Sequence, residues 1–268
     1  MAPYPIAANS GGWQNVIEGQ TALLLASSLS QLQGAVTATS STQLWGVELN
    51  GLFFRLFDRS RFCLDALVGF LYDDLAETLK MQYISNGPAG GTFLEAILTD
   101  DFSVHNGIFA GQVGVQGKWT SKWVYCSFLA KVGLSGAEQK SEISGTFSDP
   151  LPTLYTSYGV GTSGGIFAQP SNSGRHIQNK FIVVPERIVR LGFNPTSQCS
   201  ISVGYDILFF SNVLRPGQQI DQSINETQAG ASGGGKTPTL TGVSEPALLM
   251  KNSCYWTQGI NAGIQVQF

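Results

Sequence analysis

The chain has 268 residues, a formal net charge of −3 and only 12% charged residues, about half of the share found in soluble proteins. A soluble protein with so few charged residues would have a poorly hydrated surface. The lack of an excess of basic residues argues against a nucleic-acid partner. The sequence has no run of about eighteen apolar residues, which excludes a transmembrane helix.

Residues 1–35 show no clear periodicity, so we expect a poorly ordered leader or surface loop there and the main domain at 36–268. From residue 36 on, apolar and polar residues alternate with the period of two that is typical of strands. Short turns and long loops follow in strict alternation, with the long loops expected at 85–104, 145–174 and 216–252. The expected strands are 36–57, 62–84, 105–118, 122–144, 175–194, 199–214 and 253–268.

The last strand shows the alternation most clearly. Trp256, Ile260 and Ile264 share one face, while Asn261 and Gln265 lie on the other. Such long strands, apolar on one face, predict an all-β fold: an antiparallel up-and-down transmembrane β-barrel of about seven to eight strands. The apolar face is expected to meet lipid. In the alternative, a soluble barrel that binds an apolar ligand, that face would point inward.

An odd number of strands does not fit a bacterial barrel made by one chain, which has an even number. Either residues 18–32 contain a further strand, or the chain is an N-terminally truncated part of a larger barrel. We favour the second interpretation.

Several segments resemble the putative beta-barrel porin-7 family, outer-membrane barrels of planctomycete bacteria. The block Ser-Asn-Val-Leu-Arg-Pro-Gly at 211–217 is the most specific of them. The other segments lie at 41–50, 64–70, 109–114, 183–186, 204–205, 218–221 and 255–261. The resemblance implies the barrel fold and a location in the bacterial outer membrane more firmly than it implies an activity.

If the apolar face is outside, six charged side chains point into the lumen. They are Glu48, Asp65, Lys131, Glu186, Arg190 and Asp206. They could select solutes, as charged rings do in channels, or they could form salt bridges that fill a narrow barrel. Both interpretations stay open. Arg187 would face lipid, so we expect a β-bulge near Pro185 to shift the register.

The segment from Arg215 to Asp221 could fold inward as a constriction. The preferred interpretation is a structural loop stop with an Arg215–Asp221 pair. The terminal Phe268 is expected to be the signal through which the barrel-assembly machinery recognises the closing strand.

The leading functional hypothesis is a porin-like passive channel for small solutes, and the alternative is a non-conducting structural barrel that anchors the envelope or displays loops. Outer-membrane lipid is the expected partner, and a homo-oligomer is left open. We expect no enzyme, cofactor or metal, because the four cysteines lack metal-binding spacing.

Overall fold

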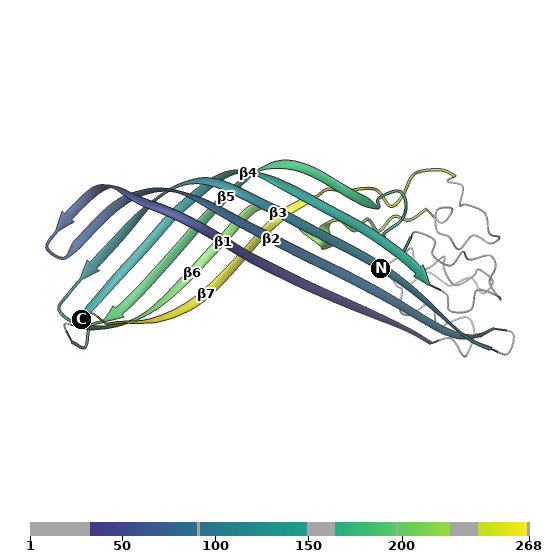
Figure 1. Cartoon of the computed structure of the whole chain (residues 1–268), viewed down its shortest axis with the longest axis horizontal. Coiled ribbons are helices and arrows are strands. Elements are labelled where there is room, and N and C mark those ends of the chain that lie inside the picture. The colour runs from purple at the N-terminus through teal and green to yellow at the C-terminus, as the bar shows by residue number, and fades with distance from the viewer. Residues whose placement is uncertain (1–32, 90–91, 149–163, 197, 226–240, 267–268) are drawn as a thin grey trace, which may run out of the picture.

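The computed structural model describes residues 33–89, 92–148, 164–196, 198–225 and 241–266. Seven antiparallel strands in these ranges form one curved sheet in chain order, a half-barrel (Figure 1). They are β1 (Gln33–Arg59), β2 (Phe62–Ala89), β3 (Thr92–Thr120), β4 (Val124–Ser148), β5 (Gly174–Phe193), β6 (Cys199–Leu214) and β7 (Asn252–Val266), with a 3₁₀ turn, η2 (Pro216–Gln218), after β6. No helix in the described ranges is long and apolar enough to cross a membrane.

The all-β antiparallel prediction is confirmed, and the expected bounds of β6 agree with those in the structure. The connections β1–β2, β3–β4 and β5–β6 lie at one end of the sheet (Figure 1). β7 ends there too, because Val266 pairs with Cys199. In the described residues β1 and β7 do not pair with each other, so each forms an edge of the sheet. Residues 18–32 lie outside the described residues, and the number of strands in the closed barrel stays a prediction.

The prediction of a long loop at 85–104 is wrong. β2 and β3 continue as a paired ladder from Ser85 opposite Ala96 to Ala89 opposite Thr92. The alternation was hard to see because its phase inverts along β3. Phe109 and Val113 occupy odd positions and are exposed, whereas Phe102 and Val104 occupy even positions and are buried. The strand continues without a register shift while its apolar side chains change face.

Outward-facing apolar side chains form a band that we call the apolar belt. It extends from Trp119, beside the short turns, to Trp45, Tyr72 and Phe109. Exposed side chains between these levels include Val47, Leu49, Phe70, Val113, Leu134, Phe181, Leu191, Val203, Ile260 and Ile264. From Phe62 to Tyr72, β2 rises about 33 Å, or about 25 Å in height at the usual strand tilt. This is the height of the apolar band on outer-membrane barrels.

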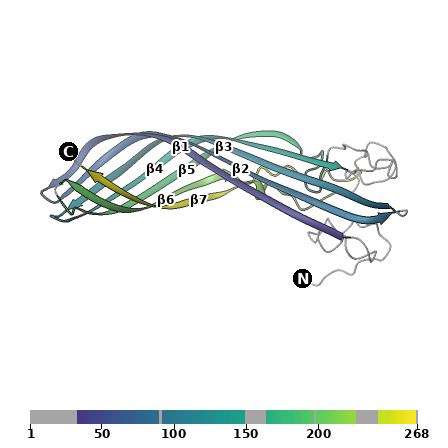
Figure 2. The ribbon, with the colours of Figure 1, turned by 60° about the horizontal axis from the view of Figure 1, so that its bottom comes forward.

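Beyond the apolar belt the two faces exchange character. The outer face there carries charged residues such as Lys80, Glu138 and Glu142. The inner face carries a buried apolar cluster made of Tyr83, Leu98, Phe102 and Ile143, together with Ile166, Phe167 and Ala168 from the segment before β5. The strands therefore extend beyond the belt as a water-exposed sheet with an internal core. Figure 2 shows how far they reach from the short-turn end.

Asp100 holds that segment against the sheet. Its carboxylate is fully buried and accepts hydrogen bonds from the backbone N–H groups of Phe167 (3.1 Å) and Ala168 (2.9 Å). Gly165 packs so closely that a Cβ atom there would lie 1.9 Å from Asp100 Oδ1. A larger residue at position 165 would push the segment off the sheet.

Stability is expected to depend on pH through Asp100, which lies beyond the apolar belt. Burial raises the pKa of its carboxyl group, and the backbone hydrogen bonds offset only part of that effect. Since an unfolded aspartate ionises near pH 4, the free energy of unfolding should fall as the pH rises from about 4 toward the higher folded pKa. Asp100→Asn keeps an acceptor oxygen and should remove this contribution.

Urea unfolding between pH 4 and 7 would measure the difference between wild type and Asp100→Asn. Asp101→Asn is the matched control, because Asp101 is the next residue of β3 and accepts a hydrogen bond from Ser103 (3.1 Å). Identical pH slopes for the wild type and Asp100→Asn would contradict the assignment.

Candidate functional site on the concave face

The inner face of the sheet is concave, because side chains from strands far apart in the sheet meet on it. Lys131 on β4 reaches Glu48 on β1, and Asn106 on β3 reaches Leu214 on β6. All six charged residues expected in the lumen lie on this face: Glu48, Asp65, Lys131, Glu186, Arg190 and Asp206. Their role in lining a pore stays a prediction.

Lys131 is the centre of a charged cluster on the concave face. Its side chain is 1% exposed and forms salt bridges with Glu48 and with Glu186, the latter at 2.8 Å. Gln112 also donates to Glu48 (2.7 Å). Gly114 faces Lys131 across the ladder, and a Cβ atom there would lie 2.6 Å from the Lys131 Cβ. The glycine therefore gives the lysine the room to lie flat against the wall.

The other three predicted lumen residues lie closer to the short turns. Asp65 accepts a hydrogen bond from Arg55 (3.2 Å), and Asp206 accepts one from Asn261 (3.0 Å). Arg190 lies opposite Gly204 on β6 and forms no salt bridge with any described residue. The six residues therefore divide into one cluster around the buried Lys131, two carboxylates with their own partners, and one cation without a salt bridge in the described residues.

An apolar cluster also occupies the concave face, and the sequence analysis missed it. Its buried members are Leu71, Leu75, Ile108, Ala110, Ala137, Ile182, Val184, Phe210 and Val213. In the sequence these residues stand between outward apolar positions, so the local pattern resembles an uninterrupted apolar run. Runs such as Phe70-Leu71-Tyr72 and Ile182-Val183-Val184 were the available signal of a strand buried on both faces.

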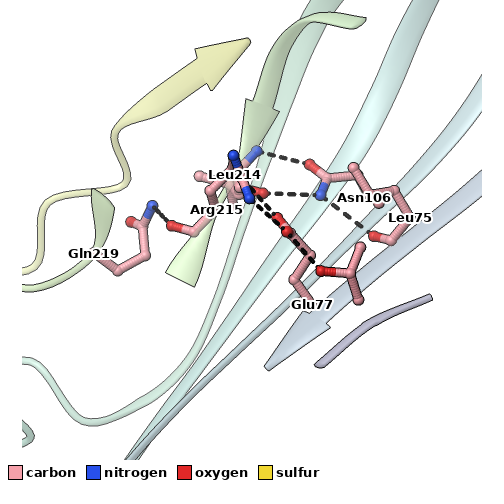
Figure 3. A network of polar contacts seen from close by, with 7 residues as sticks. Leu75, Glu77, Asn106, Leu214, Arg215 and Gln219 are labelled. Atoms are coloured by element: carbon pink, nitrogen blue, oxygen red, sulfur yellow. Dashed lines mark hydrogen bonds and ion pairs between the residues drawn. The ribbon is translucent and has the colours of Figure 1, made fainter. Parts of the chain in front are cut away.

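Residues 213–221, which we call the inner strap, leave the end of β6 and cross the concave face toward β2 and β3 (Figure 3). Asn106 holds its start as a peptide group would: its Oδ1 accepts from Leu214 N (2.8 Å) and its Nδ2 donates to Leu214 O (3.1 Å). Arg215 then forms a bidentate pair with Glu77, at 3.0 and 2.9 Å. The Glu77 side chain is 3% exposed.

The expected Arg215–Asp221 pair is therefore wrong, because the arginine reaches across to β2. Asp221 instead accepts hydrogen bonds from the backbone N–H groups of Ser223 (3.0 Å) and Ala247 (2.8 Å). Gln219, fully buried, donates to the carbonyl groups of Arg215 (3.1 Å) and Lys251 (2.8 Å). The segment thus folds inward, and its role as a constriction stays a prediction.

The Ser-Asn pair of the 211–217 block has a structural role at the top of β6. The β5–β6 ladder ends at Glu186 opposite Leu208, next to Pro185, which has no N–H group to donate. Beyond that point Ser211 Oγ accepts from Val183 N (2.9 Å), and Asn212 Nδ2 donates to Phe181 O (3.2 Å). These side chains replace the missing ladder bonds and free the end of β6 to bend inward.

The β-bulge expected near Pro185 is wrong. β5 pairs with β4 in one unbroken register, with Pro185 opposite Val132 and Arg187 opposite Ala130. Arg187 consequently faces outward and is exposed within the apolar belt. The register shifts instead occur in β1 near Leu52 and Arg55, and between β6 and β7 at 210–213.

The comparisons with known proteins give one match. The family model described as Putative beta barrel porin-7 matches residues 14–268, nearly the whole chain. No curated protein and no solved structure matches the chain. Phe268, the expected assembly signal, lies outside the described residues. Because the family model covers the sheet, the charged cluster and the inner strap together, the chain belongs to the putative beta barrel porin-7 family.

Proposed function

We propose that this protein lies in the bacterial outer membrane as a β-barrel and acts as a porin-like passive channel for small solutes. One observation carries the proposal: the same strands present a belt of apolar side chains outside and charged side chains inside. Lipid would cover the outer wall and water would meet the inner one. The porin family match supports this assignment.

The inner strap would set the size limit of such a channel. It crosses the concave face and is fixed to β2 by the Arg215–Glu77 pair. A lumen crossed by a strap leaves room only for narrow solutes. The belt makes outer-membrane lipid the proposed partner, and the closing strand would carry the signal read by the barrel-assembly machinery.

A non-conducting structural barrel is the second candidate, and two observations favour it. The apolar cluster occupies the concave face, and Lys131 is buried between two carboxylates. Packed side chains and paired charges are the features of a barrel filled by its own residues.

Planar-bilayer recordings of the full-length chain distinguish the two candidates. The channel predicts stepwise currents in symmetric potassium chloride, absent when only detergent is added. Membrane insertion is checked in parallel by protease protection in vesicles. A chain that inserts correctly but carries no current would contradict the channel and support the structural barrel.

A further inference from the structure

A cavity of about 490 Å³ opens at the short-turn end of the concave face. Its walls include Lys118 at the end of β3, Lys122 and Trp123 in the next turn, Tyr125 on β4 and Ser200 on β6. Lys118 Nζ lies 4.8 Å from the centre of the Tyr125 ring, and Lys122 Nζ lies 5.4 Å from that of Trp123. The aromatic rings thus position two ammonium groups at the mouth without neutralising them.

The strand register places a third cation beside them. Lys118 pairs with Ser127, Ser127 with Arg190, and Arg190 with Gly204, so one rung of the ladder crosses four strands. Alternation puts all four residues on the concave face. Neighbouring strands lie about 4.8 Å apart, so the backbones of Lys118 and Arg190 are separated by about 10 Å, with the Ser127 hydroxyl between them. That spacing leaves room for a small anion between the two side chains.

Close packing directs the Arg190 side chain. A Cβ atom on Gly204 would lie 2.8 Å from Arg190 Cγ, so the arginine stem rests on the glycine. In the same way Tyr125 covers Gly192, where a Cβ atom would lie 2.0 Å from the ring. The two glycines let the Arg190 stem and the Tyr125 ring lie along the wall.

The nearest carboxylates on this face already have other partners. Asp65 binds Arg55, and Asp206 accepts from Asn261. Neither Lys118 nor Arg190 forms a salt bridge within the part of the chain that the structure describes, whereas Lys131, deeper in the sheet, has two. Cations without a salt bridge on a concave wall concentrate anions from solution.

We propose that Lys118 and Arg190, with the Ser127 hydroxyl between them, form a binding site for a small soluble anion of the phosphate or carboxylate class. Lys118 contributes a point charge, and the Arg190 guanidinium can donate two parallel hydrogen bonds to such an oxyanion. The site deepens the proposed function, on which it rests for the enclosed aqueous lumen, and it makes the channel prefer anions at its short-turn mouth.

Phosphate titration tests the site without any need for current. The full-length chain, refolded in non-ionic micelles, is titrated with inorganic phosphate by calorimetry. Lys118→Gln/Arg190→Gln should bind phosphate at least about tenfold more weakly than wild type, because two charge-assisted contacts are lost. Arg187→Gln is the matched control, with the same charge change on the outer face of β5. Equal affinities in the double variant and wild type would overturn the site.

The source of the anion is settled in the same experiment. Non-ionic micelles contain no lipid phosphate, so saturable binding there identifies a soluble anion. Binding that occurs only to vesicles containing phosphatidylglycerol would overturn the proposal in favour of a lipid headgroup.

Reversal potentials in a potassium chloride gradient supply the second measurement. Wild type should favour chloride, the double variant should shift toward potassium, and Arg187→Gln should match wild type. Anion preference that is unchanged in the double variant would overturn the site's role in conduction. If no variant conducts, the proposed channel fails while phosphate binding still decides the site.

Discussion

Lys131→Met is expected to destabilise the barrel by about 3 kcal/mol. Methionine has nearly the shape of lysine, so packing against Gly114 is retained while the charge is removed. Glu48 and Glu186, whose side chains are 34% and 20% exposed, would then lose their shared buried cation on the concave face. Two carboxylates left together without a counter-charge repel each other, and the loss of a buried partner is strongly destabilising. The midpoint of urea unfolding in detergent or lipid vesicles measures the effect.

Two variants show whether the charge is responsible. Lys118→Met makes the same substitution on an exposed lysine without a salt bridge in the described residues and should change stability by less than about 0.5 kcal/mol. Adding Glu48→Gln and Glu186→Gln to Lys131→Met removes the unpaired charges and should restore part of the loss. A Lys131→Met protein as stable as wild type would show that the cluster contributes little.

Arg215→Met is expected to release the inner strap from β2. The substitution removes both hydrogen bonds to Glu77 and leaves a buried carboxylate with Thr42 Oγ1 (3.1 Å) as its donor. A loss of about 3 kcal/mol would reduce the ratio of docked to released strap about a hundredfold. Two results should follow: larger current steps in a planar bilayer, and protease cleavage between residues 215 and 225 in folded protein.

The double variant Glu77→Gln/Arg215→Met separates strap release from general misfolding, because it removes the arginine without leaving a buried charge. It should be more stable than Arg215→Met and still show the larger currents. Arg175→Met, on an exposed arginine at the start of β5, is the control for losing a positive charge. Currents and cleavage equal to wild type in both Arg215 variants would show that the strap does not restrict the lumen.

The long strands and the outward direction of the apolar belt could be predicted because both depend on local alternation. Trp256, Ile260 and Ile264 share one face of β7 in the sequence, and they are exposed on the outer face in the structure. An extended backbone fixes this two-residue period without reference to other strands. The inner positions of Glu48 and Lys131 follow from the same rule.

The continuation of β2 and β3 beyond the belt could not be predicted in this way. The apolar side chains change from odd to even positions between Phe109 and Val104, and an inverted phase looks like the end of a strand. The surroundings change there, from an apolar belt outside to a polar outer surface over an internal core. Which positions of a strand are apolar depends on which of its faces is buried. The alternation therefore inverts where the buried face changes, even though the strand continues unchanged.

The sequence by itself determined the strand class, the inner and outer faces within the belt, and the charged residues on the concave wall, since each depends on neighbours along one strand. Only the tertiary structure decided the partners: Arg215 with Glu77 instead of Asp221, Asn106 with Leu214, and one cationic rung from Lys118 to Arg190. These contacts join strands far apart in the chain. They depend on the register and curvature of the sheet, and the pairing of all seven strands together determines both.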